Sequence, residues 1–374
     1  MRSIKLKPAH YILLFVISFG LLYLVLGRFA TNVFMQTVKP AEYSALNIPS
    51  WLSFGFAWDS GWYSSIALNG YPKTIAPVYA FFPLFPLLVG FIAKFGVHFM
   101  TAGFLINIVA SFLASLALYK LAREFISENL SLYTVLLFLV FPMSFFLFAF
   151  YTEAVFCALS FWAIYFARRQ SWAYASILAM LCTATRLVGL IVIIPIILEY
   201  LRAKQYSVKK FDYNIFWLAL MPLGIVSYMI YTHSIVGSYF AMFEAYKLGE
   251  WSYQSFQPNF ILTLIRSAIQ VGKTGEFLVL LPLLCWFGFA TVIFVLRKKL
   301  PLSYIVYSVV SLIFIVLNGN VTSVNRYVLP LFPVFIGIVM LLKNKQLLLT
   351  FLIAIFMLCQ GVFFVMFANG HWIG

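Results

Sequence analysis

Long apolar runs constrain this chain more than any other feature of its sequence. Four of them are HYILLFVISFGLLYLVLG, LSLYTVLLFLVFPMSFFLFAF, EFLVLLPLLCWFGFATVIFVL and LLLTFLIAIFMLCQGVFFVMF. Each is long enough to cross roughly 30 Å of hydrocarbon as an α-helix. Of the 374 residues, 64% are hydrophobic and 9% are charged, whereas a soluble domain has roughly 45–50% apolar and about 25% charged residues. The sequence therefore predicts an all-α polytopic membrane protein.

The short basic stretches between the runs predict how the helices are threaded. We expect eleven spans, at 10–28, 101–121, 131–149, 152–167, 171–184, 187–203, 213–234, 276–296, 301–318, 327–342 and 347–367. A cytoplasmic N-terminus then places most of the basic side chains on the inner side: Arg2, Lys5, Lys7, Lys120, Arg123, Arg168, Arg169, Arg202, Lys204, Lys209, Lys210, Arg297, Lys298, Lys299, Lys343 and Lys345. This distribution follows the positive-inside rule. It accounts for the net charge of +15 without a nucleic-acid partner.

The stretch YAFFPLFPLLVGFIAKFG (79–96) resembles a further span but is too short to be one. Pro83 and Pro86 cannot continue a helix begun earlier, because proline lacks the N–H donor and clashes with the preceding turn. A helix from Pro86 to Phe95 would be about 15 Å long. We therefore predict an interfacial helix here, lying on the outer leaflet.

The stretch 171–203 is predicted to form two short spans rather than one. A single helix would be about 50 Å long and would bury Arg186 near its middle. A bend at 183–189 instead places Arg186 at the outer surface. The resulting chain is one membrane domain, residues 1–374, with long outer segments at 29–100 and 235–275. Because long loops are usually functional, we expect the outer face to carry the activity.

A lone carboxylate stands among aromatic residues in the first outer segment. In WDSGWYSSIALNGYP (58–72), Asp59 lies between Trp58 and Trp62 and is followed by Tyr63 and Tyr71. We expect a short helix from Asp59 to Asn69. One interpretation is that Asp59 caps this helix while the aromatic residues form an interfacial belt. The alternative is a reactive or binding carboxylate.

Three further charged residues are predicted at the outer ends of spans. Glu153 stands at a helix start, and Arg186 and Arg326 lie where spans meet the outer surface. Glu153 could be only a favourable N-terminal charge, and the arginines could be a snorkelling or packing pair. Ionisable residues at membrane depth are, however, functional hypotheses by default. Two carboxylates and two arginines on one apolar face suit an anionic, lipid-linked substrate.

Several motifs together resemble the PIG-V-type family, the GPI mannosyltransferase II-like proteins. They are Trp58-Asp59-x-x-Trp62-Tyr63, Asn69-Gly70-Tyr71, Phe81-Phe82-Pro83-x-Phe85-Pro86, Tyr151-Thr152-Glu153-Ala154 and Arg326-Tyr327-x-Leu329-Pro330-x-Phe332-Pro333, in that order over roughly residues 50–340. The resemblance implies a GT-C-type glycosyltransferase that uses a polyprenyl-phosphate sugar on the extracytoplasmic side.

The resemblance also implies roles for individual residues. Asp59 would be the general base for an inverting transfer of a hexose, mannose in this family. Arg186 and Arg326 would hold the phosphate, and Glu153 would position a sugar hydroxyl or an arginine. The other substrate-binding candidates are Trp58, Trp62, Tyr63, Tyr71, Phe82, Tyr151, Asn325 and Tyr327. No metal-ligand cluster is evident in the sequence, although Asp59 and Glu153 together could hold a divalent ion.

The acceptor is expected to be a lipid-linked or cell-envelope glycan. Eukaryotic members of the family tend to have an acid where this chain has Gly61 and histidine where it has Trp62, so a GPI acceptor is not carried over. The compact loops favour a prokaryotic cell membrane. Two alternatives remain: a transporter or flippase for a lipid-linked anion, for which repeat symmetry would be expected, and a non-catalytic subunit that binds polyprenyl phosphate.

Overall fold

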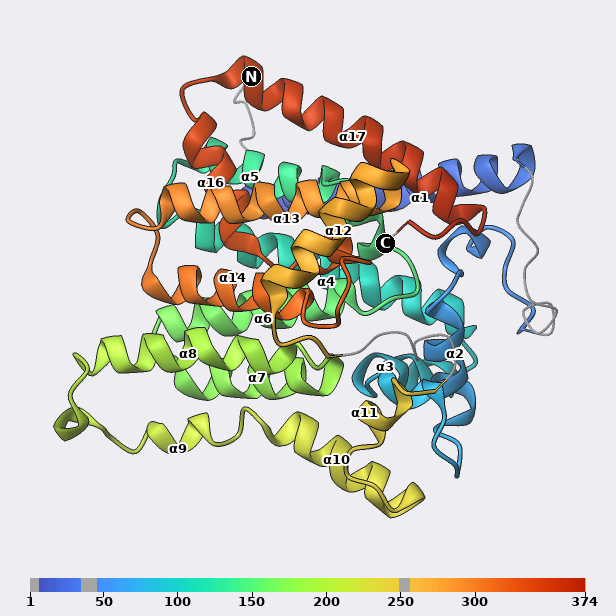
Figure 1. The fold of residues 1–374 in the computed structure, drawn as a ribbon, viewed down its shortest axis with the longest axis horizontal. Coiled ribbons are helices and arrows are strands. Elements are labelled where there is room, and N and C mark those ends of the chain that lie inside the picture. The colour runs from blue at the N-terminus through green and yellow to red at the C-terminus, as the bar shows by residue number, and fades with distance from the viewer. Residues whose placement is uncertain (1–6, 35–45, 249–255, 374) are drawn as a thin grey trace.

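The computed structural model describes residues 7–34, 46–248 and 256–373. Helices lie side by side across the molecule, and loops and short helices gather at its two ends (Figure 1). The described part of the chain contains no strand. Arg2, Lys5 and the parts of the two outer segments at 35–45 and 249–255 lie outside the described residues.

Each predicted span corresponds to one helix or one pair of helices. The elements are α1 (Pro8–Val33), α4 (Phe99–Ala122), α5 (Glu128–Val140), α6 (Glu153–Arg168), α7 (Trp172–Thr185), α8 (Gly189–Ala203), α9 (Ile215–Leu218) with α10 (Leu223–Val236), α13 (Phe277–Leu296), α14 (Leu302–Ile315), α16 (Phe332–Leu342) and α17 (Gln346–Ala368). Four of the described helices, α1, α4, α13 and α17, are long and apolar enough to cross a membrane by themselves. The all-α membrane architecture predicted from the apolar runs is confirmed.

The span predicted at 131–149 is wrong in its second half. The helix α5 ends at Val140, because Pro142 disfavours a helical conformation in the residue before it. The chain from Phe141 to Thr152 is buried and contains only the short 3-10 turn η4 (Ser144–Leu147). This irregular segment leads directly into α6.

Polar side chains from two long helices satisfy the buried carbonyl groups of this irregular segment. Asn107 of α4 donates to the carbonyls of Ala149 (2.5 Å) and Tyr151 (3.1 Å). Gln360 of α17 donates to those of Leu139 and Phe141 (2.8 and 2.9 Å). Non-helical backbone is tolerated at membrane depth only where protein groups satisfy it. The segment is therefore a fixed support for the start of α6.

Proline also explains the two other corrections to the predicted spans. The span expected at 213–234 is broken into α9 and α10, with Pro222 at the N-cap of the second helix. The span expected at 327–342 becomes helical as α16 only at Phe332, after Pro330, and the short α15 (Val324–Tyr327) precedes it. Both predictions followed the length of the apolar run and ignored the helix breaker within it.

The break predicted from the buried arginine is confirmed, and the short helix predicted from proline is present but begins two residues earlier than expected, at Leu84; its place on the outer leaflet stays a prediction. The helices α7 and α8 are separate, and Arg186 has extended backbone angles (φ −158°, ψ 151°) between them. The helix predicted within 79–96 is α3 (Leu84–Ala93), which has 10 residues. It packs against α2 (Ser60–Asn69) closely enough that a Cβ at Gly90 would lie 2.8 Å from the Ala67 carbonyl oxygen.

The outer segments contain more structure than the sequence indicated. The second one holds α11 (Ala241–Ala245) and the 15-residue α12 (Phe260–Thr274), which Asn259 caps by accepting a hydrogen bond from the Leu262 amide (3.1 Å). The remaining short elements are the 3-10 turns η2 (Ser53–Gly55), η3 (Pro77–Ala80) and η5 (Val208–Lys210).

The two ends of the molecule differ in charge. The helices α2, α3 and α11 gather at the right-hand end of Figure 1, whereas the α8–α9, α13–α14 and α16–α17 connections lie at the left-hand end. Those three connections carry the basic stretches at 202–210, 297–299 and 343–345. This separation agrees with the charge-based threading, and the assignment of the right-hand end to the outside remains a prediction. We call the two ends outer and inner.

Candidate functional site

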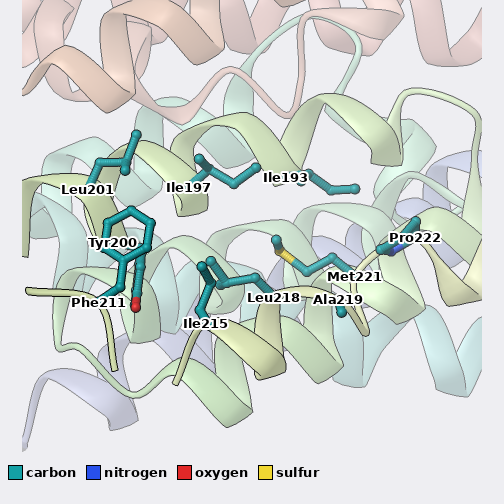
Figure 2. A pocket seen from close by; sticks show the side chains of 10 residues that line it. All are labelled: Ile193, Ile197, Tyr200, Leu201, Phe211, Ile215, Leu218, Ala219, Met221 and Pro222. Atoms are coloured by element: carbon teal, nitrogen blue, oxygen red, sulfur yellow. The ribbon is translucent and has the colours of Figure 1, made fainter. Parts of the chain in front are cut away.

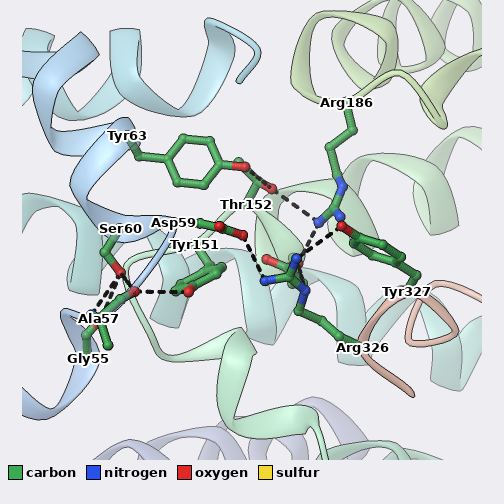
Figure 3. A network of polar contacts seen from close by, with 11 residues as sticks. Gly55, Ala57, Asp59, Ser60, Tyr63, Tyr151, Thr152, Arg186, Arg326 and Tyr327 are labelled. Atoms are coloured by element: carbon green, nitrogen blue, oxygen red, sulfur yellow. Dashed lines mark hydrogen bonds and ion pairs between the residues drawn. The ribbon is translucent and has the colours of Figure 1, made fainter. Parts of the chain in front are cut away.

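Asp59 binds an arginine rather than capping its helix. It occupies the N-cap position of α2, but its side chain makes no capping hydrogen bond. Instead, Arg326 Nη1 donates to Asp59 Oδ2 at 2.9 Å (Figure 3). The residue before it, Trp58, has a left-handed backbone (φ 55°), a conformation that is rare for bulky residues. The interpretation of Asp59 as a helix cap is therefore not supported by its contacts.

Glu153 lies between both arginines. It is the first residue of α6, and its side chain is 2% exposed. Arg186 Nη1 donates to Glu153 Oε1 at 2.5 Å, and Arg326 Nε lies 3.5 Å from the same oxygen. The four side chains thus alternate in sign as Asp59, Arg326, Glu153 and Arg186, and their formal charges sum to zero. We refer to these four residues as the outer network.

The side chains of the outer network meet because they lie at breaks between helices. Arg186 projects from the extended break between α7 and α8, and Arg326 projects from the single turn α15, which follows Ser323 in a left-handed conformation (φ 64°). Glu153 follows the irregular segment that Asn107 supports. Side chains at helix ends can reach a common point that residues in mid-helix could not, because no further turn of helix covers them.

Aromatic rings enclose the arginines. The guanidinium of Arg326 lies within 4.9–5.6 Å of the ring centroids of Phe146, Tyr151, Tyr327 and Trp372. Tyr327 also lies 5.1 Å from the Arg186 guanidinium, and its hydroxyl accepts from Arg326 Nη2 at 3.1 Å. Ring faces attract cations and keep water away. Ionic contacts are stronger in such an environment than in bulk water.

Hydroxyl groups connect the network to α2. Arg186 Nη1 donates to Thr152 Oγ1, and the Tyr63 hydroxyl lies at the same distance, 3.3 Å, from that oxygen (Figure 3). The Tyr151 hydroxyl donates to the Ala57 carbonyl at 2.9 Å. Burial raises the pKa of Tyr63, so its hydroxyl keeps its proton at neutral pH. These contacts hold α2, and with it Asp59, at a fixed distance from α6.

Other predicted binding residues lie beside the network rather than in it. Trp62 stacks on Phe81 with ring centroids 6.0 Å apart. The Tyr71 hydroxyl donates to the Phe81 carbonyl (2.5 Å), and Phe82 packs against Tyr228 of α10 (5.1 Å). These rings join the first outer segment to α10. Their contacts are those of packing residues.

Asn325 contacts the end of the described chain, and its expected role in binding substrate stays a prediction. Its side-chain amide donates to the carbonyl of Ile373 at 3.1 Å. It therefore binds the residues that follow α17 rather than facing the network.

The sequence analysis missed three residues at this site. Thr152 lies within the motif Tyr151-Thr152-Glu153-Ala154 and is not among the expected binding residues. Tyr246 follows α11 and is close enough to Asp59, Arg186 and Arg326 to interact with them electrostatically. Trp372, beyond α17, lies against Arg326. Nothing local distinguishes the two aromatic residues from other interfacial rings, so only their position in the fold reveals them.

The carboxylates do not fit a divalent metal ion. Arg326 contacts both of them, at 2.9 Å to Asp59 and 3.5 Å to Glu153, so a guanidinium already occupies the space between them. No group of three or more His, Cys, Asp or Glu side chains that could bind a metal occurs in the parts of the chain that the structure describes. We derive no step through a metal.

A hollow beside the network is polar at one end and apolar elsewhere. Its polar lining is formed by Glu153, Arg186, Arg326 and Tyr327. The remaining walls come from α6, α8, α14 and the turn before α16: Phe156, Val188, Ile191, Tyr307, Ser311, Ile315, Pro330 and Leu331. The hollow has a volume of about 20 Å³, which is room for about one water molecule. Its lining nevertheless combines charged side chains with mainly apolar ones.

A larger groove, of about 400 Å³, lies between α8 and α9 (Figure 2). Its lining is apolar apart from the hydroxyl of Tyr200, which lies 3.1 Å from Asp212 Oδ1. It contains none of the network residues and no charged side chain. It offers no group for chemistry, so we place the functional site at the smaller hollow.

Comparison with known proteins bears on the fold. Neither a protein-family model nor a curated protein matches the sequence. The structure of ArnT from Cupriavidus metallidurans bound to undecaprenyl phosphate, however, superposes over 87% of this chain with a TM-score of 0.53 at 12% sequence identity. The chain has the GT-C membrane glycosyltransferase fold.

The match leaves part of ArnT without a counterpart. This chain covers 59% of the length of that ArnT structure. A second ArnT structure, in the apo state, aligns over the same shares of both chains with a TM-score of 0.45 and 15% identity. The GT-C fold agrees with the wider group to which the sequence motifs pointed, whereas the resemblance to the PIG-V-type family itself rests on those motifs alone.

Proposed function

We propose that this protein is a membrane glycosyltransferase that uses a polyprenyl-phosphate sugar. The observation that carries the proposal is the Asp59–Arg326 pair (2.9 Å), which borders a hollow that combines arginines with apolar walls. The GT-C fold supports it, as does the polyprenyl phosphate named with the similar ArnT structure. The motif resemblance adds a hexose, mannose, as the sugar, and an acceptor that is a lipid-linked or cell-envelope glycan on the extracytoplasmic side.

The walls of the hollow, which has a volume of about 20 Å³, would move apart to admit the donor, and its phosphate would then lie at the arginines. Arg186 and Arg326 present guanidinium donors, which bind phosphate oxygens with charge-assisted hydrogen bonds. The apolar side chains of α8 and α14 would surround the first isoprene units. Negative charge that develops on the phosphate as it leaves would then lie beside fixed cations in a water-poor site.

Asp59 would act as the general base. The acceptor hydroxyl oxygen attacks the anomeric carbon and forms the new glycosidic bond, while the bond from that carbon to the phosphate oxygen breaks. The hydroxyl proton passes to Asp59, and polyprenyl phosphate departs with the bonding electrons. A single displacement of this kind inverts the configuration at the anomeric carbon.

The ion pair links donor binding to the freeing of the base. Arg326 Nη1 donates to Asp59 Oδ2. A phosphate that binds Arg326 competes for the same guanidinium, and this releases the carboxylate oxygen for the acceptor proton. The four side chains of the network sum to zero formal charge, so a bound phosphate would add the negative charge that shifts this pairing. The donor would therefore bind before the acceptor.

The proposal is tested with the purified protein. Labelled polyprenyl-phosphate mannose, glucose and arabinose are each incubated with extracted membrane glycolipids, and transfer is compared between wild type and Asp59→Asn. We expect transfer of one sugar, with inverted configuration, by the wild type alone. Binding of the lipid phosphate without transfer of any sugar would favour a transporter or a non-catalytic binding subunit and would overturn the proposal.

A further inference from the structure

We propose that Trp372 and Trp58 form a carbohydrate-binding corner next to Asp59. This inference rests on the proposed glycosyltransferase function and adds a substrate contact from the residues that follow the last helix. The ring centroids of the two tryptophans are 5.3 Å apart with an interplanar angle of 77°. Trp58 immediately precedes the proposed base in the chain, and Trp372 lies over Arg326 at 5.6 Å. The corner therefore adjoins both members of the Asp59–Arg326 pair.

A specific turn directs the chain back to the site after α17. Gly370 has a positive φ of 87°. Its amide donates to the Phe367 carbonyl (2.9 Å), and the His371 amide donates to the Met366 carbonyl (3.0 Å). These two bonds define a Schellman motif, in which a glycine reverses the chain at a helix end. Trp372 is the second residue after that glycine.

The end of this turn is anchored on the other side of Trp372. Ile373 is 5% exposed, and its carbonyl accepts from the side chain of Asn325 at 3.1 Å. Asn325 is the neighbour of Arg326 in α15. Trp372 is thus held between the Schellman turn and α15, which fixes its ring beside the network.

The two rings remain available to a ligand. Trp58 is 41% exposed, and Trp372 is only partly buried. The left-handed backbone of Trp58 (φ 55°) is a conformation that is rare for non-glycine residues and is concentrated at functional sites. The two rings share one corner beside the ionic network and are both partly exposed there, so a ligand bound at Asp59 would meet them.

The chemistry of a pyranose fits this corner. One face of such a ring carries C–H groups that lie flat on an aromatic face, whereas its hydroxyls point outward toward polar groups. The isoprenoid tail has its own apolar walls in α8 and α14. The rings beside Asp59 lie where the sugar and the attacking hydroxyl must meet. The ligand is therefore a sugar ring, from either the donor or the acceptor glycan.

The test compares Trp372→Leu with Trp51→Leu, which removes an exposed tryptophan of the first outer segment outside the site. Affinity is measured for polyprenyl phosphate and for polyprenyl-phosphate mannose, and the acceptor KM is measured with the active enzyme. We expect the Trp372→Leu variant to bind bare polyprenyl phosphate with wild-type affinity. Either its affinity for the sugar-bearing donor should fall by roughly tenfold, or its acceptor KM should rise by roughly tenfold. This is the size of effect expected when one stacking ring is lost. Trp372→Phe should recover part of the loss, and Trp51→Leu should show none.

The outcomes separate this proposal from the proposed function. A lower affinity for the sugar-bearing donor would assign the corner to the donor sugar. A raised acceptor KM would assign it to the acceptor glycan. An equal loss for bare polyprenyl phosphate would overturn the proposal, because Trp372 would then only shield Arg326. Unchanged donor affinity and KM would also overturn it. If the wild type transfers no sugar, the proposed function fails, while the comparison of sugar-bearing with bare lipid still tests the corner.

Discussion

Two ionic networks lie at opposite ends of the helices, and they differ in how fully their groups are paired. In the inner network, Arg168 of α6 binds Glu124 (2.5 Å) and Glu199 of α8 (3.3 Å). Glu199 also binds Arg202 (2.7 Å) and accepts from the Ser303 hydroxyl of α14. Both carboxylate oxygens of the buried Glu199 therefore have partners.

The outer network also pairs carboxylates with arginines, but two of its charged groups have a buried atom that makes no hydrogen bond within the described chain, whereas beside the inner network the buried atom without one is the neutral Tyr304 hydroxyl. Glu153 Oε2 and Arg326 Nε have no hydrogen-bond partner among the residues described. Aromatic rings surround the Arg326 guanidinium on several sides, whereas one ring, Tyr304, is found against Arg168 in the described structure. Unpaired buried polar groups are unfavourable unless something binds them. The comparison indicates that the inner network ties helices together and that the outer one has capacity for a ligand.

The largest difference between the networks is expected in turnover. Asp59→Asn should lower sugar transfer by about 10²- to 10⁴-fold, because an amide cannot take the acceptor proton. The amide oxygen can still accept from Arg326, so folding and binding of the donor lipid should be retained. Initial rates and lipid binding are measured on the same preparation. Turnover above about a tenth of wild type would contradict the assignment of the base.

Glu153→Gln is the matched control for that substitution. It removes the other carboxylate charge of the outer network while keeping the shape of the side chain. If Glu153→Gln abolishes turnover and Asp59→Asn is mild, then Glu153 is the base and the two roles have been exchanged.

The inner network should show its effect in stability rather than in chemistry. Arg168→Met leaves the buried Glu199 without one of its cations, and breaking a buried pair from one side typically lowers the free energy of unfolding by about 3–5 kcal/mol. Unfolding in detergent measures this loss. Adding Glu199→Gln to the same protein should recover part of it. Per-molecule turnover of the folded Arg168→Met fraction should stay near wild type, and a selective loss of turnover would refute the division of roles.

Donor binding should depend on the arginines of the outer network. Arg186→Gln and Arg326→Gln should each weaken polyprenyl-phosphate binding by roughly 10- to 150-fold, because each removes a charge-assisted contact worth about 1.5–3 kcal/mol. Arg266→Gln, an exposed arginine of α12, serves as the control for loss of one positive charge. Unchanged affinity in both network variants would leave Arg186 and Arg326 as packing residues.

The smallest effect on activity is expected from two cysteine substitutions that test which end of the molecule faces outward. Cysteines are introduced at Lys94, after α3, and at Arg169, after α6, both of which are exposed. The background lacks the native Cys157, Cys182, Cys285 and Cys359. An impermeant thiol reagent should label the first position from outside and not the second, with turnover unaffected in both. The reverse labelling pattern would exchange the outer and inner ends.

The positions of helix breaks were best predicted from single residues rather than from the length of an apolar run. A buried mid-helix arginine predicted the break at Arg186, and Pro83 with Pro86 predicted the short α3; both are confirmed. Pro142, Pro222 and Pro330 were equally visible, but the apolar runs around them were interpreted as continuous helices. Hydropathy reports whether a segment is buried and does not report where its backbone leaves the helix.

The residues of the candidate site likewise fall into those that could be predicted from the sequence and those that could not. Asp59, Glu153, Arg186 and Arg326 could be predicted because charged residues are scarce in this chain, and the structure places all four within one network. Trp372 could not be predicted, because one tryptophan among the nine in the sequence carries no local signal of its neighbours. Its position depends on the Schellman turn and on Asn325, which come together only in the folded molecule.

The spacing of the outer network along the chain has a consequence for biogenesis. Glu153 and Arg186 are 33 residues apart, whereas Asp59 and Arg326 are 267 residues apart. Domains generally form from the N-terminus during synthesis, so Glu153 can find Arg186 while much of the protein is still unmade. Asp59 must wait in the nascent chain until α15 has been inserted. Completion of the proposed catalytic pair is thus one of the last assembly events.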